Sequence, residues 1–276
     1  MRKTLNLYNN DKVQIAAHRG CAGSNIPCNT IPAFEIALKG GAAILELDLF
    51  KTTDDQIFVF HTGKESQQLN KNIKVGDLSS NEIRQLKLVN VDFAPTAWGL
   101  NSFDEILEHF KGKCILNLDR CGTFMPDVIK QIRRHNMAEQ ILLKNSPKEE
   151  VLKAVSELAP DIMFMPIYFN TDTISEKLFN MDINFMGAEL VFETEQADII
   201  KPEYIQKMKQ KGITLWGNAI IFDDAYPLAA GHSDDVSLLK DPKDGWGWLV
   251  DNGFDIIQTD WVYQCSDYLK QIGVNK

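Results

Sequence analysis

The sequence predicts an α/β protein built as one closed (β/α)8 barrel. Eight short apolar runs, each about the length of one buried strand, recur along the 276 residues. Amphipathic stretches, with apolar residues three and four positions apart, lie between these runs. The runs are continuously apolar, which is typical of parallel strands covered on both faces. An open, doubly wound sheet is the alternative, because it has the same alternation of strands and helices.

The predicted strands are rich in apolar residues and are separated by turn or helix signals. In chain order they are Val13–Ala17, Ala43–Leu49, Cys114–Leu118, Gln140–Lys144, Ile162–Tyr168, Asn184–Val191, Ile213–Asn218 and Phe254–Thr259. The clearest predicted helices are Ile31–Lys39, Val128–His135, Glu149–Leu158 and Tyr204–Lys211. Glycines at 40, 41 and 212 mark helix ends, and Pro126 suits a first helical turn.

Two connections are longer than a simple helix requires. Residues 51–110 contain an extra strand (Ile57–Phe60), a turn-rich run (Asn70–Asp77) and two helical pieces. We interpret this interval as an insertion after the second strand of a single domain, residues 1–276. The segment Phe222–Lys243 is rich in Asp, Pro, Gly and Ser, and predicts a lid or a loop that shapes the substrate site.

Composition narrows the classes of partner. The chain is 44% hydrophobic and 24% charged, with 29 Lys and Arg against 38 Asp and Glu, a formal net charge of −9. Such a chain lacks the positive field that non-specific nucleic-acid binding requires. No apolar run is long enough to span a membrane, so stable membrane insertion is not expected. We expect a small-molecule substrate, and the sequence leaves the oligomeric state open.

The first ten residues contain no apolar segment typical of a signal peptide. The five cysteines have no CxxC spacing, so a zinc ribbon is not expected. An odd number of cysteines without a secretion signal favours reduced thiols. We therefore expect a cytoplasmic protein, unless a signal peptide has been trimmed from this sequence.

Polar side chains gather at the ends of the predicted strands, where barrel enzymes place their active sites. These residues are His18, Arg19, Glu46, Asp48, His61, Asp119, Lys144, Glu189, Trp216, Asn218 and Asp260. Carboxylates without cysteine or histidine pairs suit a hard cation, so Glu46, Asp48 and Asp119 predict one Mg²⁺ or Ca²⁺ site. Arg19 beside that cation favours a phosphate, and His18 with His61 can supply an acid and a base.

The ordered motifs resemble the glycerophosphodiester phosphodiesterase family. The resemblance rests on 17-AHRG-20, 29-NT-30, 46-ELD-48, His61, 69-LNK-71, 77-DLS-79, 116-LNLD-119 and 253-GFDIIQTD-260. It covers nearly the whole chain, and the combination is specific although each piece is short. The resemblance implies a TIM barrel with a small insertion, a divalent cation, and hydrolysis of glycerophosphodiesters to glycerol 3-phosphate and an alcohol.

The resemblance also implies roles for particular residues. The family's catalytic histidines match His18 and His61, and its phosphate-binding arginine matches Arg19. Glu46 and Asp48 match metal ligands, while Asp119 stands where the family has a third carboxylate, usually glutamate. Trp216 resembles the aromatic residue that packs against the substrate. We also assign Lys144 and Glu189 to substrate binding, although each can equally be a surface or loop charge.

Four positions depart from the family pattern. Cys28 replaces a glutamate, Thr62 an aspartate, Asp119 a glutamate and Cys121 a lysine. Arg120 or Lys144 can replace the missing lysine charge. Cys28 and Cys121 remove opposite charges, which is expected of two neighbouring residues, although independent replacement explains them equally. Two alternatives follow: a weakened relative that only binds phosphodiesters, and a phospholipase-type barrel that acts on an intact lipid.

Overall fold

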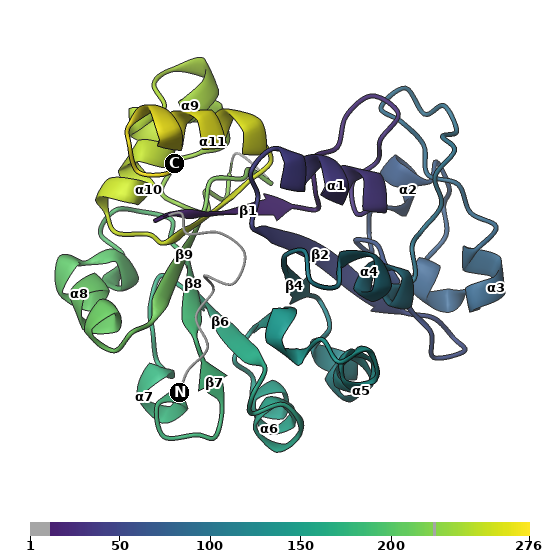
Figure 1. Ribbon diagram of the computed structural model, residues 1–276, viewed down its shortest axis with the longest axis horizontal. Helices are drawn as coiled ribbons and strands as arrows, with labels where there is room; N and C mark the ends of the chain where they lie inside the picture. Colours follow the sequence, from purple (N-terminus) through teal and green to yellow (C-terminus); the bar gives the residue numbers. More distant parts are fainter. Residues whose placement is uncertain (1–11, 223–224) are drawn as a thin grey trace.

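Eight parallel strands form a closed barrel in the computed structural model, which describes residues 12–222 and 225–276 (Figure 1). The first strand pairs with both the second and the last, which closes the sheet and excludes the open alternative. The barrel strands are β1 (Gln14–His18), β2 (Ile44–Lys51), β4 (Ile115–Asp119), β5 (Ile141–Asn145), β6 (Met163–Phe169), β8 (Gly187–Val191), β9 (Thr214–Asn218) and β10 (Ile256–Thr259). The predicted (β/α)8 barrel is confirmed.

Helices surround the barrel and pack their apolar faces against the strands (Figure 1). They are α1 (Ile31–Lys39), α4 (Phe103–Phe110), α5 (Met125–His135), α6 (Glu149–Leu158), α7 (Ser175–Leu178), α8 (Pro202–Gln210), α9 (Asp234–Leu239), α10 (Trp248–Asp251) and α11 (Val262–Gln271). Thr30 begins α1 by accepting a hydrogen bond from the Ala33 N–H, and Asn136 ends α5 in the left-handed conformation. Two predicted helices, α1 and α6, have the expected bounds.

One predicted strand is divided in two. Residues 184–191 form β7 (Asn184–Phe185) and β8, and both pair with β6. Gly187 begins β8 at a point of close approach, because a Cβ atom there would lie 2.6 Å from the Thr214 carbonyl oxygen. Only glycine fits beside β9 at this position.

The segment after β2 forms a small subassembly beside the barrel. Strand β3 (Ile57–Val59) pairs antiparallel with β2, and the short helices α2 (Glu65–Gln68) and α3 (Ser80–Ile83) follow. Phe50, Phe58, Phe60, Leu69, Val75, Ile83, Leu88 and Leu100 form its separate apolar core. The last part of the predicted interval is α4, whose apolar face packs into the barrel core. The added structure therefore ends before α4 begins.

The long connection after β9 is partly helical. It contains α9, which begins at a Ser233 cap, so the expected irregular loop is shorter than the sequence indicates. Residues 223–224 of this segment, and the N-terminal segment considered as a signal peptide, lie outside the described residues. Within the described ranges, none of the helices has the length and apolar character needed to cross a bilayer.

Candidate active site

A cavity of about 230 Å³ opens at the carboxyl ends of the strands and contains most of the predicted site. Strand register explains the convergence, since Glu46 pairs with His18 on β1, and Asp48 pairs with Asp119 on β4. Of the nine residues predicted for the site, eight line this cavity: His18, Arg19, Glu46, Asp48, His61, Asp119, Lys144 and Glu189. Trp216 does not line it.

His18 is held by Asp260, a strand-end carboxylate whose role the sequence does not indicate. Its Nδ1 lies 2.8 Å from Oδ1 of Asp260, so Nε2 is the nitrogen left for a substrate. Asp234 in turn accepts hydrogen bonds from the Asp260 N–H, the Thr259 hydroxyl and the Trp246 indole. Burial raises the pKa of Asp234 to about 6. These two carboxylates fix the position of His18, and Asp234 gave no sequence signal because it begins α9 and does not lie at a predicted strand end.

Asp234→Asn is expected to destabilise the fold by about 1–3 kcal/mol, because an amide cannot accept hydrogen bonds from all three donors. Urea unfolding at pH 7 measures the change. Asp235→Asn is the matched control, since Asp235 is the exposed neighbour on the same helix. Equal stability of the two variants would show that the three hydrogen bonds contribute little.

Arg19 connects the first two strands. Its backbone has a left-handed φ of 56°, and its N–H donates to Oε2 of Glu46 at 3.1 Å. The Arg19 Nε lies 2.9 Å from Oδ2 of Asp48, which also accepts a hydrogen bond from the Asn29 amide. Asn29 belongs to the 29-NT-30 motif, and its side-chain amide orients Asp48.

His61 approaches the same carboxylate from the insertion. Its Nε2 lies 3.9 Å from Oδ1 of Asp48 and 3.4 Å from Nη1 of Arg120. Burial lowers the pKa of His61, and the opposing charge of Asp48 only partly offsets this. The Thr62 hydroxyl, which replaces the family's aspartate, accepts a hydrogen bond from Arg120. His61 is therefore predominantly neutral near pH 7, as a general base requires.

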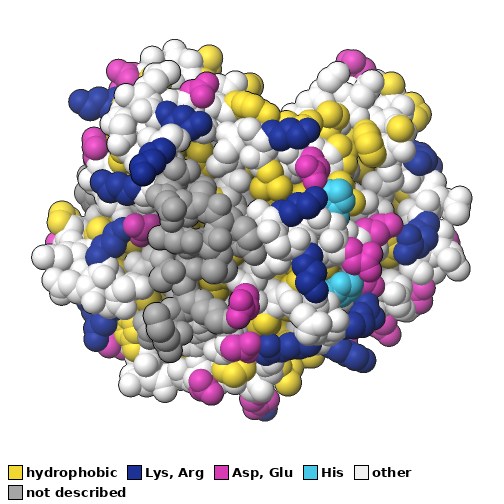
Figure 2. Space-filling model, viewed as in Figure 1, with side chains coloured by type: hydrophobic (Ala, Val, Ile, Leu, Met, Phe, Trp, Pro, Cys, Tyr) yellow, Lys and Arg dark blue, Asp and Glu magenta, His cyan; other side chains and the backbone are white. Residues whose placement is uncertain are grey.

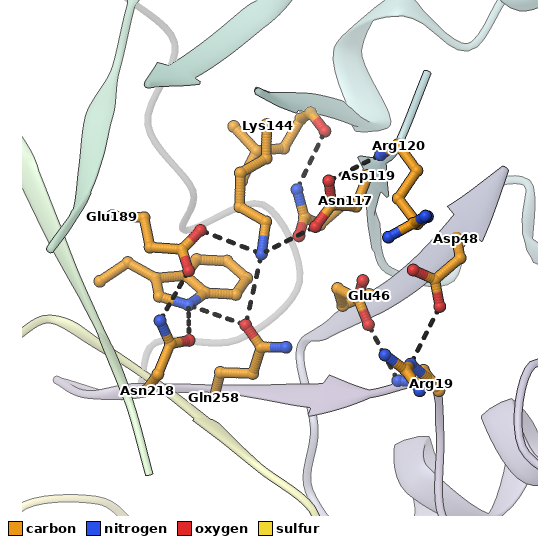
Figure 3. A network of polar contacts seen from close by, with 12 residues as sticks. Arg19, Glu46, Asp48, Asn117, Asp119, Arg120, Lys144, Glu189, Asn218 and Gln258 are labelled. Carbon is orange, nitrogen blue, oxygen red and sulfur yellow. Dashed lines mark hydrogen bonds and ion pairs between the residues drawn. The ribbon is translucent and has the colours of Figure 1, made fainter. Parts of the chain in front are cut away.

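Lys144 is the centre of a buried polar network on the opposite side of the cavity (Figure 3). Its ammonium lies 3.1 Å from Glu189, 3.4 Å from Gln258 and 3.7 Å from Asp119. Burial alone would lower the pKa of Lys144, but the carboxylates of Glu189, Asp119 and Glu46 outweigh burial and raise it. Lys144 is therefore a permanent positive charge inside the barrel.

Trp216 lies beneath this lysine. The indole is fully buried, and the Lys144 ammonium is 4.8 Å from its ring centre. Its Nε1 donates hydrogen bonds to Gln258 and Asn218, and Asn218 donates to Glu189. The predicted contact between Trp216 and substrate stays a prediction, while the observed contacts support the position of Lys144.

Lys144→Met is expected to destabilise the protein by about 3–5 kcal/mol, because it leaves Glu189 buried without its charged partner. The double variant Lys144→Met/Glu189→Gln should regain much of this loss, since it removes both charges. Thermal or urea unfolding measures both effects. Lys153→Met is the control, because the Lys153 side chain lies on the exposed face of α6. A double variant no more stable than the single one would contradict this pairing.

Glu46 is the residue best suited to a cation. Its carboxylate is only 2% exposed, and within the described chain no lysine or arginine side chain lies within ion-pair distance. Burial, followed by repulsion from Asp48, raises the pKa of Glu46 well above its usual range. A cation beside the Glu46 and Asp48 carboxylates would offset this negative charge. These donors fit Mg²⁺ or Ca²⁺ on chemical grounds.

The three carboxylates predicted as metal ligands do not all come together in the structure. In residues 12–222 and 225–276, no group of three or more His, Cys, Asp or Glu side chains is close enough to hold a metal ion. Asp119 lies in register with Asp48, but its nearest described cation is Lys144. Two carboxylates with substrate phosphate and water are a common environment for Mg²⁺, so Glu46 and Asp48 remain compatible with the cation.

The two unexpected cysteines have different surroundings. All five cysteines are free. Cys28 accepts a hydrogen bond from Gln68 of the insertion, whereas the Cys121 sulfur lies 4.0 Å from that of Met125 in the barrel core. Burial raises the pKa of Cys28 to about 11 and that of Cys121 to about 12. Both are therefore neutral thiols near pH 7, and no disulfide joins them.

Comparisons with known proteins agree with this geometry. The model of the glycerophosphoryl diester phosphodiesterase family matches residues 18–120, which include both histidines and the three carboxylates. A second family model, described as a domain of unknown function, matches residues 164–269. A glycerophosphodiester phosphodiesterase of Bacillus altitudinis is 27% identical over 231 residues, 76% of this chain and 94% of that protein.

Solved structures share the whole architecture. A glycerophosphoryl diester phosphodiesterase from Parabacteroides distasonis aligns with a TM-score of 0.78 at 20% identity, over 96% of this chain and 89% of that one. A phosphodiesterase from Oleispira antarctica, in complex with the product sn-glycerol-3-phosphate, aligns with a TM-score of 0.67 at 17% identity, over 93% and 96%. These comparisons show that residues 18–120 are similar in sequence to the glycerophosphoryl diester phosphodiesterase family, and that the whole barrel has the fold of solved phosphodiesterases.

Proposed function

We propose that this protein hydrolyses glycerophosphodiesters to glycerol 3-phosphate and an alcohol, with the help of one divalent cation. The observation that supports this most is the convergence of His18, His61, Arg19 and the carboxylates on one cavity. The cavity combines groups for proton transfer with positive charge for a phosphate. The sn-glycerol-3-phosphate in the Oleispira structure supports the same class of product.

Glu46, Asp48 and Asp119 would hold the cation, either directly or through water. When bound, it would stabilise negative charge on the reacting phosphate and lower the pKa of a hydroxyl or water bound to it. Arg19 and Lys144 add positive charge on two sides of the cavity. Asn29 keeps Asp48 aligned, so the second ligand has a fixed orientation.

The two histidines have different environments, which suggests different roles. His61 has a lowered pKa and is suited to remove a proton from the glycerol 2-hydroxyl or a water molecule that attacks phosphorus. The Asp260 carboxylate orients His18 through Nδ1 and leaves Nε2 facing the cavity, so His18 is positioned to pass a proton to the departing alkoxide. In each case the free nitrogen must reach the reacting oxygen.

Release of glycerol 3-phosphate from glycerophosphocholine is the direct test. We expect turnover with added Mg²⁺ or Ca²⁺, at least a tenfold loss with EDTA, and recovery when the metal is restored. Unchanged turnover in EDTA would contradict the cation. Binding of glycerophosphocholine by calorimetry without product release would instead identify a binding-only relative.

A further inference from the structure

The charged side chains of the cavity form two groups. Figure 3 shows one group around Arg19 and another around Lys144. The first contains Glu46 and Asp48, and the Arg19 Nε lies 2.9 Å from Oδ2 of Asp48. The second contains Asp119, whose Oδ2 lies 3.7 Å from the Lys144 ammonium. The three carboxylates predicted as metal ligands are therefore divided between two positive side chains.

Both carboxylate oxygens of Asp119 already have partners. Oδ1 accepts a hydrogen bond from the Arg120 N–H, and Oδ2 faces the Lys144 ammonium. A metal ion that binds Asp119 directly must take one of these oxygens from its present partner. The backbone N–H is fixed at the end of β4, so the lysine is the partner against which a cation competes.

Lys144 differs from the other lysines by its burial. On the face drawn in Figure 2, lysine and arginine side chains lie at the surface among acidic ones. Within residues 12–222 and 225–276, Lys144 is the one buried lysine. A fully buried lysine is rare unless it is paired, and the ammonium lies 3.1 Å from Oε2 of Glu189. Lys144 is therefore held in place by one carboxylate while it faces Asp119.

Glu46 is in the opposite situation. It is buried, and among the described residues no lysine or arginine side chain lies within ion-pair distance of its carboxylate. Asp48 lies two residues further along β2, so both side chains point to the same side of the strand. Mg²⁺ is usually bound by one or two carboxylates together with water and substrate phosphate. The two carboxylates of β2 are therefore enough for a divalent cation.

We propose that Lys144 competes with the divalent cation for Asp119 and so weakens metal binding. The ammonium holds Asp119 on its own side of the cavity, and the cation binds Glu46 and Asp48 directly and meets Asp119 only through water. Lys144 supplies a positive charge that stays in the cavity whether or not the metal is bound. This inference rests on the cation of the proposed function and specifies which residue controls its binding.

Titration with Mn²⁺ tests the ligand set without any need for turnover. Mn²⁺ prefers the same carboxylate and water ligands as Mg²⁺, and the electron paramagnetic resonance signal of the unbound ion reports how much is bound. Glu46→Gln should raise Kd at least about 30-fold because it removes a direct ligand, whereas Asp119→Asn should change Kd less than about threefold. Both variants replace a carboxylate by its amide, so they are matched in shape and charge. Equal losses of affinity would show that Asp119 is a direct ligand and would overturn the proposal.

Removal of the lysine tests the competition itself. Lys144→Met/Glu189→Gln removes one charge of each sign, so the net charge of the cavity is unchanged. Asp119 can then bind the cation, and Kd for Mn²⁺ should fall at least about fivefold. Glu189→Gln alone is the matched control, because it keeps the ammonium beside Asp119 and should not tighten binding. A double variant that binds Mn²⁺ no more tightly than the parent would show that Lys144 does not compete.

The triple variant, with Asp119→Asn added to that pair, identifies the carboxylate responsible. The substitution of Asp119 should have little effect in the parent but should raise Kd at least about fivefold in the double variant, because the two sites are coupled. A gain that survives Asp119→Asn would come from another group and would overturn the role of Asp119. Circular dichroism shows whether each variant is folded. If the double variant does not fold, the comparison of Asp119→Asn with Glu46→Gln still decides between direct and water-mediated binding.

Metal binding and hydrolysis are measured separately, so the two proposals can fail separately. The expected order of Mn²⁺ affinities without release of glycerol 3-phosphate would support the competition while the hydrolytic function fails. Hydrolysis of glycerophosphocholine with equal Mn²⁺ affinities in the parent and the double variant would overturn the competition and leave the hydrolytic function intact. If neither protein binds Mn²⁺, the competition is overturned whether or not glycerol 3-phosphate is released.

Discussion

His18→Ala and His61→Ala are each expected to lower kcat for glycerophosphocholine by about 10²–10⁴-fold, because each removes a group that transfers a proton in the transition state. The loss should be mainly in kcat, since Arg19 and Lys144 still supply the charge that binds phosphate. Release of glycerol 3-phosphate with saturating metal measures the effect. Circular dichroism and unfolding show whether each variant keeps its fold.

His109→Ala is the control, because His109 lies on α4 and pairs with Glu35 away from the cavity. It should retain activity within about twofold of the unmodified enzyme. The lowered pKa of His61 also predicts that the acidic limb of the kcat/KM profile lies below the usual histidine range. More than a tenth of the activity remaining in both cavity variants would refute the acid–base assignment.

Glu46→Gln should have opposite effects on stability and on activity. The variant keeps the shape of the side chain and removes a buried negative charge that repels Asp48. Metal-free Glu46→Gln should therefore unfold at a higher temperature than the metal-free enzyme at pH 8. Its turnover should fall at least about 10²-fold, because a neutral amide is a poor ligand for a divalent cation.

The pH dependence follows from the direction of the shift. The folded-state pKa of Glu46 is raised above its unfolded value, so the native state binds the proton more tightly. Its contribution to stability is complete below the unfolded pKa of about 4.3 and is lost as pH rises through the folded pKa. We expect the stabilisation by Glu46→Gln to appear only as pH rises through this window, and to shrink when Mg²⁺ is added.

Differential scanning calorimetry at pH 4 and pH 8, with and without Mg²⁺, measures both dependences. Glu203→Gln on α8 is the surface control and should show neither. A Glu46→Gln variant that is less stable than the parent at pH 8 without metal would show that the Glu46 carboxylate is already compensated by its neighbours. Near-normal turnover would remove Glu46 from the set of metal ligands.

Strand and helix alternation made the barrel predictable, because buried parallel strands require continuous apolar runs and covering helices. The eight predicted strands all form, seven with bounds shifted by one or two residues and one divided in two. Met186 interrupts the apolar run 184–191 without any change in composition, and the contact of Gly187 with β9 marks the break. Likewise, the sequence pattern places α4 within the insertion, whereas in the structure its apolar face packs into the barrel core.

The positions of the candidate site residues were predictable where they follow from the topology of the barrel, which brings the strand ends together. Parallel strands in one barrel present all their carboxyl ends at one rim, so residues from Glu46 to Glu189 were expected to converge whatever their separation in sequence. Whether a strand-end side chain lines the cavity or lies buried beneath it was not predictable in this way. Trp216 pairs in register with Glu189, which lines the cavity, yet the large ring of Trp216 fills the interior beneath Lys144.

The sequence by itself determined the closed barrel, the end of it that carries the polar residues, and the chemistry those residue types can perform. Only the tertiary structure decided which carboxylate holds His18, which cation compensates Glu189, and that Trp216 lies beneath the cavity instead of lining it. The physical reason is distance in space. Periodicity and strand ends are properties of neighbouring residues, whereas hydrogen-bond partners and cavity walls come from loops that only folding brings together.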